Sequence, residues 1–508
     1  MKPKLLKMLF GRAGAMLLIV LMEALLLFGF VRNFYEHLAW IEGVLRLFSV
    51  LIVLHIIRTS RHLSSDLMWI LLIILFPVSG TLVYLFLGAN LITSRTLWNL
   101  VSSTADSKRY YQQDPAVLRE MEKHAPAMRG QFRYIAKSAG FPFYRNAGFD
   151  YYGLGEQGYP VMLDELRKAQ RFIFLEYFII TEGAMWNGIL EILEEKAKQG
   201  LDVRVMYDDM GSFMTLSPGY AKRMEQHGIQ CVSFNRINPV LNAVMNHRDH
   251  RKIMVIDGET AFSGGINLAD EYINVHSPYG HWKDNVIRVT GDAVWSFTVM
   301  FLTHWNAIRK QDNDFTKFRV SPRPGQPDGY IAPYGETPLD DEITSQNIYM
   351  NILNQSNDYC YICTPYLIID TELTNALILA AHRGVDVRIL TPGIPDKKLV
   401  WNITRSFYKS LILGGVRIYE YTPGFVHAKV FVSDDRVATV GTVNLDYRSL
   451  YLHFENGTYL YASQKIADIK RDYLDTLSRS HEMTAKESTF GPLKTFGLSV
   501  LRLFAPLL

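Results

Sequence analysis

Two stretches decide how this chain folds, because each repeats the other: "HRKIMVIDGETAFSGGIN" at 250–267 and "HAKVFVSDDRVATVGTVN" at 427–444. Both contain His-x-Lys, then four residues and an aspartate, then six residues and Gly-x-x-Asn. One such pattern can arise by chance, whereas two with the same spacing in one chain indicate an internal duplication.

The sequence around each motif repeats as well. The strand-like runs "RFIFLEYFII" (171–180) and "LDVRVM" (201–206) correspond to "YCYICTPYLII" (359–369) and "VDVRIL" (385–390). Amphipathic stretches that end at a glycine lie between the runs of each pair, as is typical of helices. The alternation predicts an α/β fold of two halves related by an approximate two-fold axis, each a mostly parallel sheet covered by helices.

Composition shifts and a proline- and glycine-rich stretch mark the expected boundaries. We expect a membrane anchor (1–95), a helical connector (96–140), the first α/β half (141–318), a Pro/Gly-rich linker (319–340), the second α/β half (341–489) and an amphipathic C-terminal tail (490–508).

Three apolar stretches lie in the N-terminal region, at 13–31, 44–57 and 67–87. Because about 20 apolar residues span a bilayer, they predict a transmembrane helical region with two to three hydrophobic helices. Basic residues before the first stretch predict a cytoplasmic N-terminus. Two spans would return the α/β halves to the cytoplasm, which we favour, and three would place them outside.

Charge and cysteine content argue against two classes of protein. The chain has 53 Lys and Arg against 50 Asp and Glu, which disfavours a nucleic-acid-binding protein. Its cysteines, Cys231, Cys360 and Cys363, are too few for a disulfide framework or a four-thiolate zinc site, so we expect them in the core.

The motifs place several polar groups on one face. On a strand, residues i and i+2 share a face, so the histidine and lysine of each motif project together. Asp257 and Asp434 stand at turn positions, which return the chain so that Asn267 and Asn444 arrive beside the same face. Two halves meeting at the two-fold axis would therefore form one pocket. Its candidate catalytic residues are His250, Lys252, Asp257, His427, Lys429 and Asp434.

This set of groups suits a phosphodiester substrate. Lysine ammonium and asparagine amide groups can stabilise the charge that builds on phosphate oxygens in the transition state. Of two facing imidazoles, one can attack phosphorus to form a phosphohistidine while the other protonates the leaving alcohol. The sequence contains no Walker pattern and no dense carboxylate or histidine cluster, so we expect neither a nucleotide cofactor nor a metal.

The chain resembles the phospholipase D superfamily, which has paired His-x-Lys-x4-Asp motifs, and within it the bacterial cardiolipin synthases. The resemblance covers about residue 40 to the end. It rests on "NHRDHRKIMVIDG" (246–258), "GGINLADEY" (264–272), "HWKDN" (281–285), "GTVNLDYRS" (441–449), "WILLIILFPVSGTLVYLFLG" (69–88) and the closing "LRLFAPLL" (501–508).

The resemblance implies a reaction and a location. Two phosphatidylglycerol molecules would give cardiolipin and glycerol through a phosphatidyl-histidine, without a cofactor, in a multi-pass protein of the bacterial cell membrane. Its partners would be the phospholipid substrate and the bilayer, with no nucleic acid. The sequence does not determine the oligomeric state, and a homo-oligomer is one of the states that it allows.

The resemblance also implies roles for individual residues. His250 is the expected nucleophile and His427 the acid, although the near-symmetry leaves the reverse assignment open. An acidic residue after each asparagine orients the histidine, which implicates Glu455 in the second copy and Asp284 in the first. Asp257 and Asp434 are expected to be structural.

Two other functions remain open on the sequence. A hydrolase or a phosphatidyl transferase with another acceptor would use the same groups, and only the product distinguishes them. An inactive, membrane-anchored lipid-binding protein is the alternative from another class, but a binding module has no need for two imidazoles positioned for attack.

Overall fold

The computed structural model describes residues 25, 28–29, 39–59, 63–88, 95–236, 247–320 and 328–504. By internal contacts the chain divides into two units. The first comprises residues 1–92 and 237–245, and the second comprises residues 93–236 and 246–508.

The first unit is helical where the structure describes it. It contains α3 (Ala39–Thr59), α4 (Leu63–Leu75), α5 (Pro77–Val83) and a π-helical turn, η1 (Tyr84–Gly88). The apolar stretch 67–87 is thus divided at Pro77, which lacks the N–H that a continuous helix would use. Among the described residues, no helix combines the length and the hydropathy that a membrane span requires. The stretch 13–31 lies almost wholly outside the described residues.

Short helices open the second unit. They are α6 (Arg95–Ser107), η2 (Lys108–Tyr110), α7 (Pro115–His124), η3 (Pro126–Met128), α8 (Arg129–Arg133) and η4 (Tyr134–Ser138). α7 begins where the Asp114 carboxylate accepts a hydrogen bond from the N–H of Ala116 and Pro115 occupies the first helical position.

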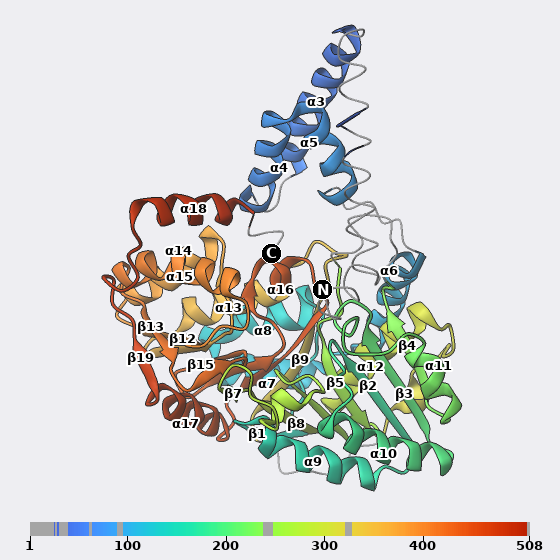
Figure 1. The fold of residues 1–508 in the computed structure, drawn as a ribbon. Helices are drawn as coiled ribbons and strands as arrows, with labels where there is room; N and C mark the ends of the chain where they lie inside the picture. The colour runs from blue at the N-terminus through green and yellow to red at the C-terminus, as the bar shows by residue number, and fades with distance from the viewer. Residues whose placement is uncertain are drawn as a thin grey trace. The chain divides into compact units, whose positions relative to one another are not determined.

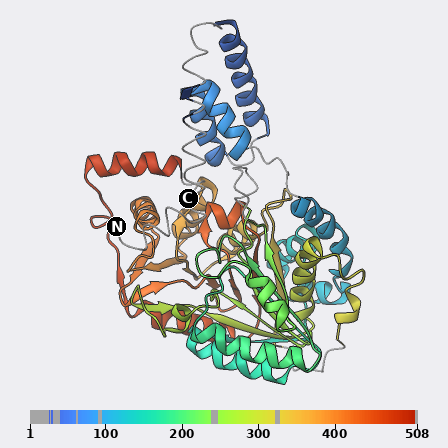
Figure 2. The ribbon, with the colours of Figure 1, turned by 45° about the vertical axis from the view of Figure 1, so that its right-hand side comes forward.

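The first half is built on a seven-stranded sheet in the order β1-β8-β6-β5-β2-β3-β4. Its strands are β1 (Ala147–Tyr152), β2 (Phe172–Tyr177), β3 (Asp202–Asp208), β4 (Gln230–Phe234), β5 (Lys252–Ile256), β6 (Thr260–Gly264) and β8 (Val286–Gly291). Its helices are α9 (Gly155–Lys168), α10 (Ala184–Lys198), α11 (Tyr220–Gln226), η6 (Asp270–Ile273), α12 (Val294–Ile308) and η7 (Thr316–Phe318). α9 and α10 lie side by side on one face of the sheet, and α12 packs on the other (Figures 1 and 2).

The second half repeats this plan on an eight-stranded sheet in the order β19-β13-β12-β10-β15-β16-β18-β9. Its strands are β9 (Tyr330–Glu336), β10 (Tyr359–Cys363), β12 (Asp386–Pro392), β13 (Arg417–Tyr421), β15 (Val430–Ser433), β16 (Val437–Gly441), β18 (Glu455–Tyr461) and β19 (Ser480–Glu482). Its helices are α13 (Thr344–Gln355), α14 (Thr371–His382), α15 (Lys398–Leu413), α16 (Tyr447–Tyr451), α17 (Ile466–Leu477) and α18 (Pro492–Leu503).

Two expectations from the sequence are wrong. The sheets are mixed rather than mostly parallel. In the first sheet, the parallel pairs are β2-β3 and β3-β4. The antiparallel pairs are β1-β8, β8-β6, β6-β5 and β5-β2. Tight turns such as the one between β5 and β6 force antiparallel pairing, whereas helical crossovers produce the parallel strands. The stretch 319–340 is also more than a linker, because it contains β9, the edge strand that pairs with β18.

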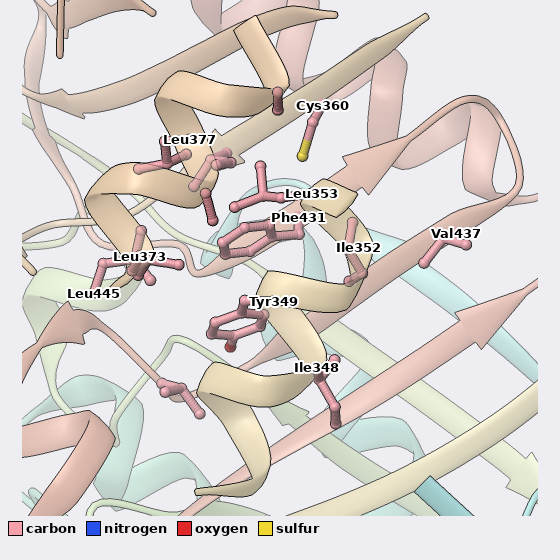
Figure 3. Close-up of a cluster of buried hydrophobic side chains, with 14 of the residues drawn as sticks. Ile348, Tyr349, Ile352, Leu353, Cys360, Leu373, Leu377, Phe431, Val437 and Leu445 are labelled. Carbon is pink, nitrogen blue, oxygen red and sulfur yellow. The ribbon is translucent and has the colours of Figure 1, made fainter. Parts of the chain in front are cut away.

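Each half has its own apolar core. In the second half α13 and α14 cover the sheet, and the ring of Tyr349 stacks on that of Phe431 with centroids 4.2 Å apart (Figure 3). The three cysteines are free and buried, which confirms them as core residues.

Short strands connect the two halves into one body. β7 (His281–Lys283) of the first half pairs in parallel with β14 (Gly424–Val426) of the second. A further pair, β11 (Leu367–Ile368) with β17 (Leu445–Asp446), lies within the second half. An isolated bridge joins Asp249 to Phe454 across the halves. These contacts bring the two motifs together.

Candidate active site

The two motif histidines occupy equivalent places. His250 precedes β5, which begins at Lys252, and His427 precedes β15, which begins one residue after Lys429. The N–H of His250 donates to the carbonyl of Phe454 at 2.9 Å, and the N–H of His427 donates to the carbonyl of Lys283 at 2.8 Å. Each histidine is therefore attached to a segment of the opposite half.

The residue that follows Phe454 and the residue that follows Lys283 each place a carboxylate against the imidazole that is attached there. Glu455 contacts Nδ1 of His250 with both oxygens at 2.9 Å, and Asp284 contacts Nδ1 of His427 at 2.7 Å. The sequence implicated both carboxylates without saying which histidine each one orients, and the structure pairs each with the histidine of the opposite half. With Nδ1 held in this way, Nε2 of each ring is the atom that can carry chemistry.

The two carboxylates are supported differently. The hydroxyl of Thr442 donates to Glu455. The equivalent position in the first half is Gly265, where an added Cβ would lie 1.8 Å from Oδ1 of Asp284. The shorter carboxylate, Asp284, thus packs against Gly265, which has no side chain. The longer one, Glu455, accepts a hydrogen bond from the side chain of Thr442.

Both motif lysines are buried beside their histidines. Nζ of Lys252 donates to the carbonyl of His250 at 2.7 Å, and Nζ of Lys429 donates likewise to the carbonyl of His427. Burial lowers the pKa of Lys252 to about 7 and that of Lys429 to about 8. An anion bound here would restore their charge, because it replaces the lost hydration.

Burial and the two lysines keep the imidazoles neutral. The pKa of His250 lies well below its ordinary value because the ring is buried and Lys252 is close. Burial and Lys429 lower the pKa of His427 to about 4, although Asp284 opposes the shift. A neutral imidazole is the form that can act as a nucleophile or a base.

The two asparagines differ in their surroundings. Asn267 accepts from the N–H of Ile179 at 3.1 Å and donates to the hydroxyl of Tyr272 at 2.6 Å. Asn444 is buried, and its side-chain oxygen has no hydrogen-bond partner among the described residues. The structure brings both asparagines to the ends of the motif hairpins.

The motif aspartates lie away from the histidines, at the far ends of β5 and β15. The carboxylate of Asp257 accepts from the N–H groups of Gln170, Arg171 and Phe172 at 2.7–2.9 Å. Asp434 accepts in the same way from residues 357–359, and both aspartates have positive φ, 55° and 53°. They fix the start of the neighbouring strand, and this geometry supports a structural role.

Sequence reasoning missed a third histidine at the site. The ring of His453 lies 5.7 Å from that of His250, centroid to centroid, and its Nδ1 lies 3.9 Å from a Glu455 oxygen. The only signal in the sequence was its position two residues before Glu455.

Two groups of side chains in the described part of the chain have metal-ligand spacing. One comprises His250, His453 and Glu455, and the other is the buried cluster of Glu176, Asp249 and His304. Arg251 lies 4.0 Å from Glu176, so that second cluster already has a cation beside it. The absence of a metal stays a prediction.

Family comparison agrees with this geometry. The family described as "Cardiolipin synthase, PLD-like domain" matches residues 162–289 and 349–477, one match in each half. A second family, "Phospholipase_D-nuclease N-terminal", matches residues 47–88 of the first unit.

Individual relatives extend over most of the chain. An uncharacterized Streptococcus mutans protein is 45% identical over 90% of this chain and 99% of its own length. A cardiolipin synthase of Alkalihalophilus pseudofirmus is 32% identical over 88% of this chain and 90% of its own. A crystal structure of phosphatidylserine synthase from Haemophilus influenzae shares the fold, with a TM-score of 0.59, 15% identity and coverage of 74% of this chain and 99% of that one. The chain therefore belongs to the cardiolipin synthase family of phospholipase D-like phosphatidyltransferases.

Proposed function

We propose that this protein is a membrane-bound cardiolipin synthase. It transfers the phosphatidyl group of one phosphatidylglycerol to a second and releases glycerol. The observation that carries the proposal is the pair of buried imidazoles, each held at Nδ1 by a carboxylate of the opposite half and each beside a buried lysine. The cardiolipin synthases among its relatives support the choice of substrate.

In the first step Nε2 of His250 attacks the phosphorus of the donor lipid. A P–N bond forms, the P–O bond to the headgroup glycerol breaks, and His427 in its protonated form donates the proton that the leaving oxygen needs. His427 is neutral in the free site, so the bound phosphodiester must favour its protonation. Its anionic charge, together with Asp284, does so.

In the second step the phosphatidyl-histidine passes its lipid to the acceptor. His427, now neutral, takes the proton from the terminal hydroxyl of the second phosphatidylglycerol. The resulting oxygen attacks phosphorus, the P–N bond breaks, and His250 returns to its initial state. One phosphodiester replaces another, so the reaction requires no external source of energy.

Exposed apolar side chains support attachment to the bilayer. In α3 they include Val44, Leu47, Leu51 and Leu54, and in α18 they include Leu493, which is 86% exposed. Apolar surface of this extent on a helix is typical of segments that contact lipid. We infer that the N-terminal region anchors the protein in the cell membrane as a multi-pass segment and that the α/β halves lie in the cytoplasm.

A product assay tests the proposal. The full-length protein in phosphatidylglycerol vesicles, with EDTA and without nucleotide, should form cardiolipin and glycerol, which lipid mass spectrometry and an assay for free glycerol detect. His250→Ala should abolish both products. His227→Ala removes a histidine of the exposed surface and should leave the rate unchanged. Phosphatidic acid as the main product would contradict the synthase assignment and indicate water as acceptor.

A further inference from the structure

A buried histidine beside the catalytic pair has no assigned task. His453 is 7% exposed, and neither of its ring nitrogens has a hydrogen-bond partner among the described residues. The ring lies next to that of His250 but does not reach the Glu455 carboxylate, from which Nδ1 is 3.9 Å away. Buried polar atoms are rarely left unsatisfied, so these nitrogens indicate a place where a ligand binds.

The surroundings of His453 are cationic. The backbone N–H of His453 donates to the backbone carbonyl of Arg448. The segment that carries His453 runs beside Arg248, whose backbone carbonyl accepts from the N–H of Phe454. Arg448 and Arg248 lower the pKa of His453 further after burial has lowered it. His247 is also close, because its Nδ1 contacts the carbonyl of Leu452 at 3.2 Å.

Two carboxylates lie near the arginines. Asp208 pairs with Nη1 of Arg248 at 3.4 Å, and the same nitrogen donates to the carbonyl of Asn235 at 2.9 Å, so Arg248 already has partners and contributes only its charge. Asp446 raises the pKa of Arg448, which burial lowers overall. Nε of Arg448 has no hydrogen-bond partner in the described part of the chain. A phosphate could accept from both Arg448 and His453, since guanidinium and imidazole donors suit phosphate oxygens.

The proposed reaction needs a second phosphate in this region. The acceptor phosphatidylglycerol attacks through one end of its headgroup glycerol, and its own phosphodiester is attached at the other end. When the new bond forms, the two phosphates are therefore separated by a three-carbon bridge. A catalytic pocket that binds only the donor phosphate would leave the second one without a counter-charge.

We propose that His453 and Arg448, in the positive field to which Arg248 adds, form a second phosphate site that binds the phosphodiester of the acceptor lipid beside the catalytic histidines. This inference rests on the proposed function. It explains how the enzyme selects an anionic phosphatidylglycerol over water or a neutral alcohol as the second substrate, because only the former places a phosphate in this site.

The test compares two acceptors with the same donor. The full-length protein in phosphatidylglycerol vesicles forms cardiolipin by itself and, with a short primary alcohol in excess, also forms the phosphatidyl alcohol. In Arg448→Gln and in His453→Asn we expect the rate of cardiolipin formation to fall about tenfold, as for the loss of one charge-assisted contact. Formation of the phosphatidyl alcohol should change by less than about twofold, because donor binding and phosphohistidine formation use other residues.

Two further variants complete the design. Arg448→Lys restores the positive charge and should recover part of the preference for phosphatidylglycerol, which a purely structural role would not predict. Arg471→Gln removes an exposed arginine of α17 and should change neither product.

Three results would overturn the inference: equal loss of both products, no loss of either, or no recovery in Arg448→Lys. The proposed function is judged separately, by whether the unmodified protein forms cardiolipin. The second phosphate site is judged by the ratio of the two products in the variants.

Discussion

Glu455 holds His250 with two oxygens, while Asp284 holds His427 with one. The residues behind them differ too, a threonine hydroxyl in one half and a glycine in the other. The two imidazoles therefore have unequal environments although the motifs repeat. This inequality makes it possible to assign a separate step of the reaction to each histidine.

Glu455→Gln should resemble loss of His250 rather than loss of His427. The amide keeps the size of the side chain but no longer stabilises the correct tautomer, so we expect the rate of enzyme labelling by radioactive phosphatidylglycerol to fall roughly 100-fold. Rapid-quench measurement of the phosphohistidine checks this. Asp284→Asn is the comparison variant. Because Asp284 orients His427, this change should slow both formation of the phosphohistidine and activation of the acceptor hydroxyl. Labelling at the normal rate in Glu455→Gln would contradict the assignment of His250 as nucleophile.

Gly265→Ala should damage the site through Asp284. The new methyl group would collide with the carboxylate and displace it from His427, so we expect kcat to fall by roughly 10- to 100-fold while the fold is retained. Steady-state cardiolipin synthesis and circular dichroism measure the two effects. The matched change Thr442→Ala removes only a hydroxyl and should cost less. An unchanged kcat in Gly265→Ala would show that Asp284 is not required at this position.

The pH dependence should follow the lysines. Their charged forms are lost as pH rises through their lowered pKa values, about 7 for Lys252 and about 8 for Lys429. We therefore expect kcat/KM for phosphatidylglycerol to fall as pH rises above about 7, and more steeply above about 8, since this parameter reports the free enzyme. The decline in kcat should begin at higher pH, because bound phosphate stabilises the ammonium groups. A constant kcat/KM up to pH 10 would contradict this.

At the scale of the elements, the motif hairpins depend on their aspartates. Asp257→Ala removes the acceptor for three backbone N–H groups and leaves the start of β2 without its cap. We expect the free energy of unfolding to fall by about 1–3 kcal/mol, because part of this backbone can bond to water instead. Denaturant titration measures the loss. The folded fraction should retain kcat within a few-fold, and Glu191→Gln on the exposed side of α10 should alter neither quantity.

Sequence periodicity predicted the elements better than their assembly. The runs at 171–180 and 359–369 contain β2 and β10, and the histidines, lysines and asparagines were identified from spacing alone. Strand direction was not predictable from an apolar run, because parallel and antiparallel strands have similar composition when both faces are buried. The crossed pairing of Asp284 and Glu455 depends on contacts between the halves, which no local pattern encodes.

At the scale of the whole molecule, binding to the lipid surface should involve α18. Phe496 is 69% exposed on the same helix as Leu493, whereas Leu498 is buried. Phe496→Asp should lower cardiolipin synthesis in vesicles several-fold and leave activity in mixed micelles unchanged, because the change affects access to lipid and not the site. Thr495→Asp adds the same charge at another exposed position of the helix and should have a smaller effect. Equal losses in both lipid systems would contradict this role.

The exchange of carboxylates between the halves also bears on how such a chain could arise. Since each half supplies the group that its neighbour's histidine needs, a single half with this chemistry would be active only as a pair of identical chains. After fusion, each copy is retained because the other depends on it. A substitution near Glu455 in the second half therefore affects the chemistry of His250 in the first, and a substitution near Asp284 affects His427. Changes in the two halves are coupled at these positions.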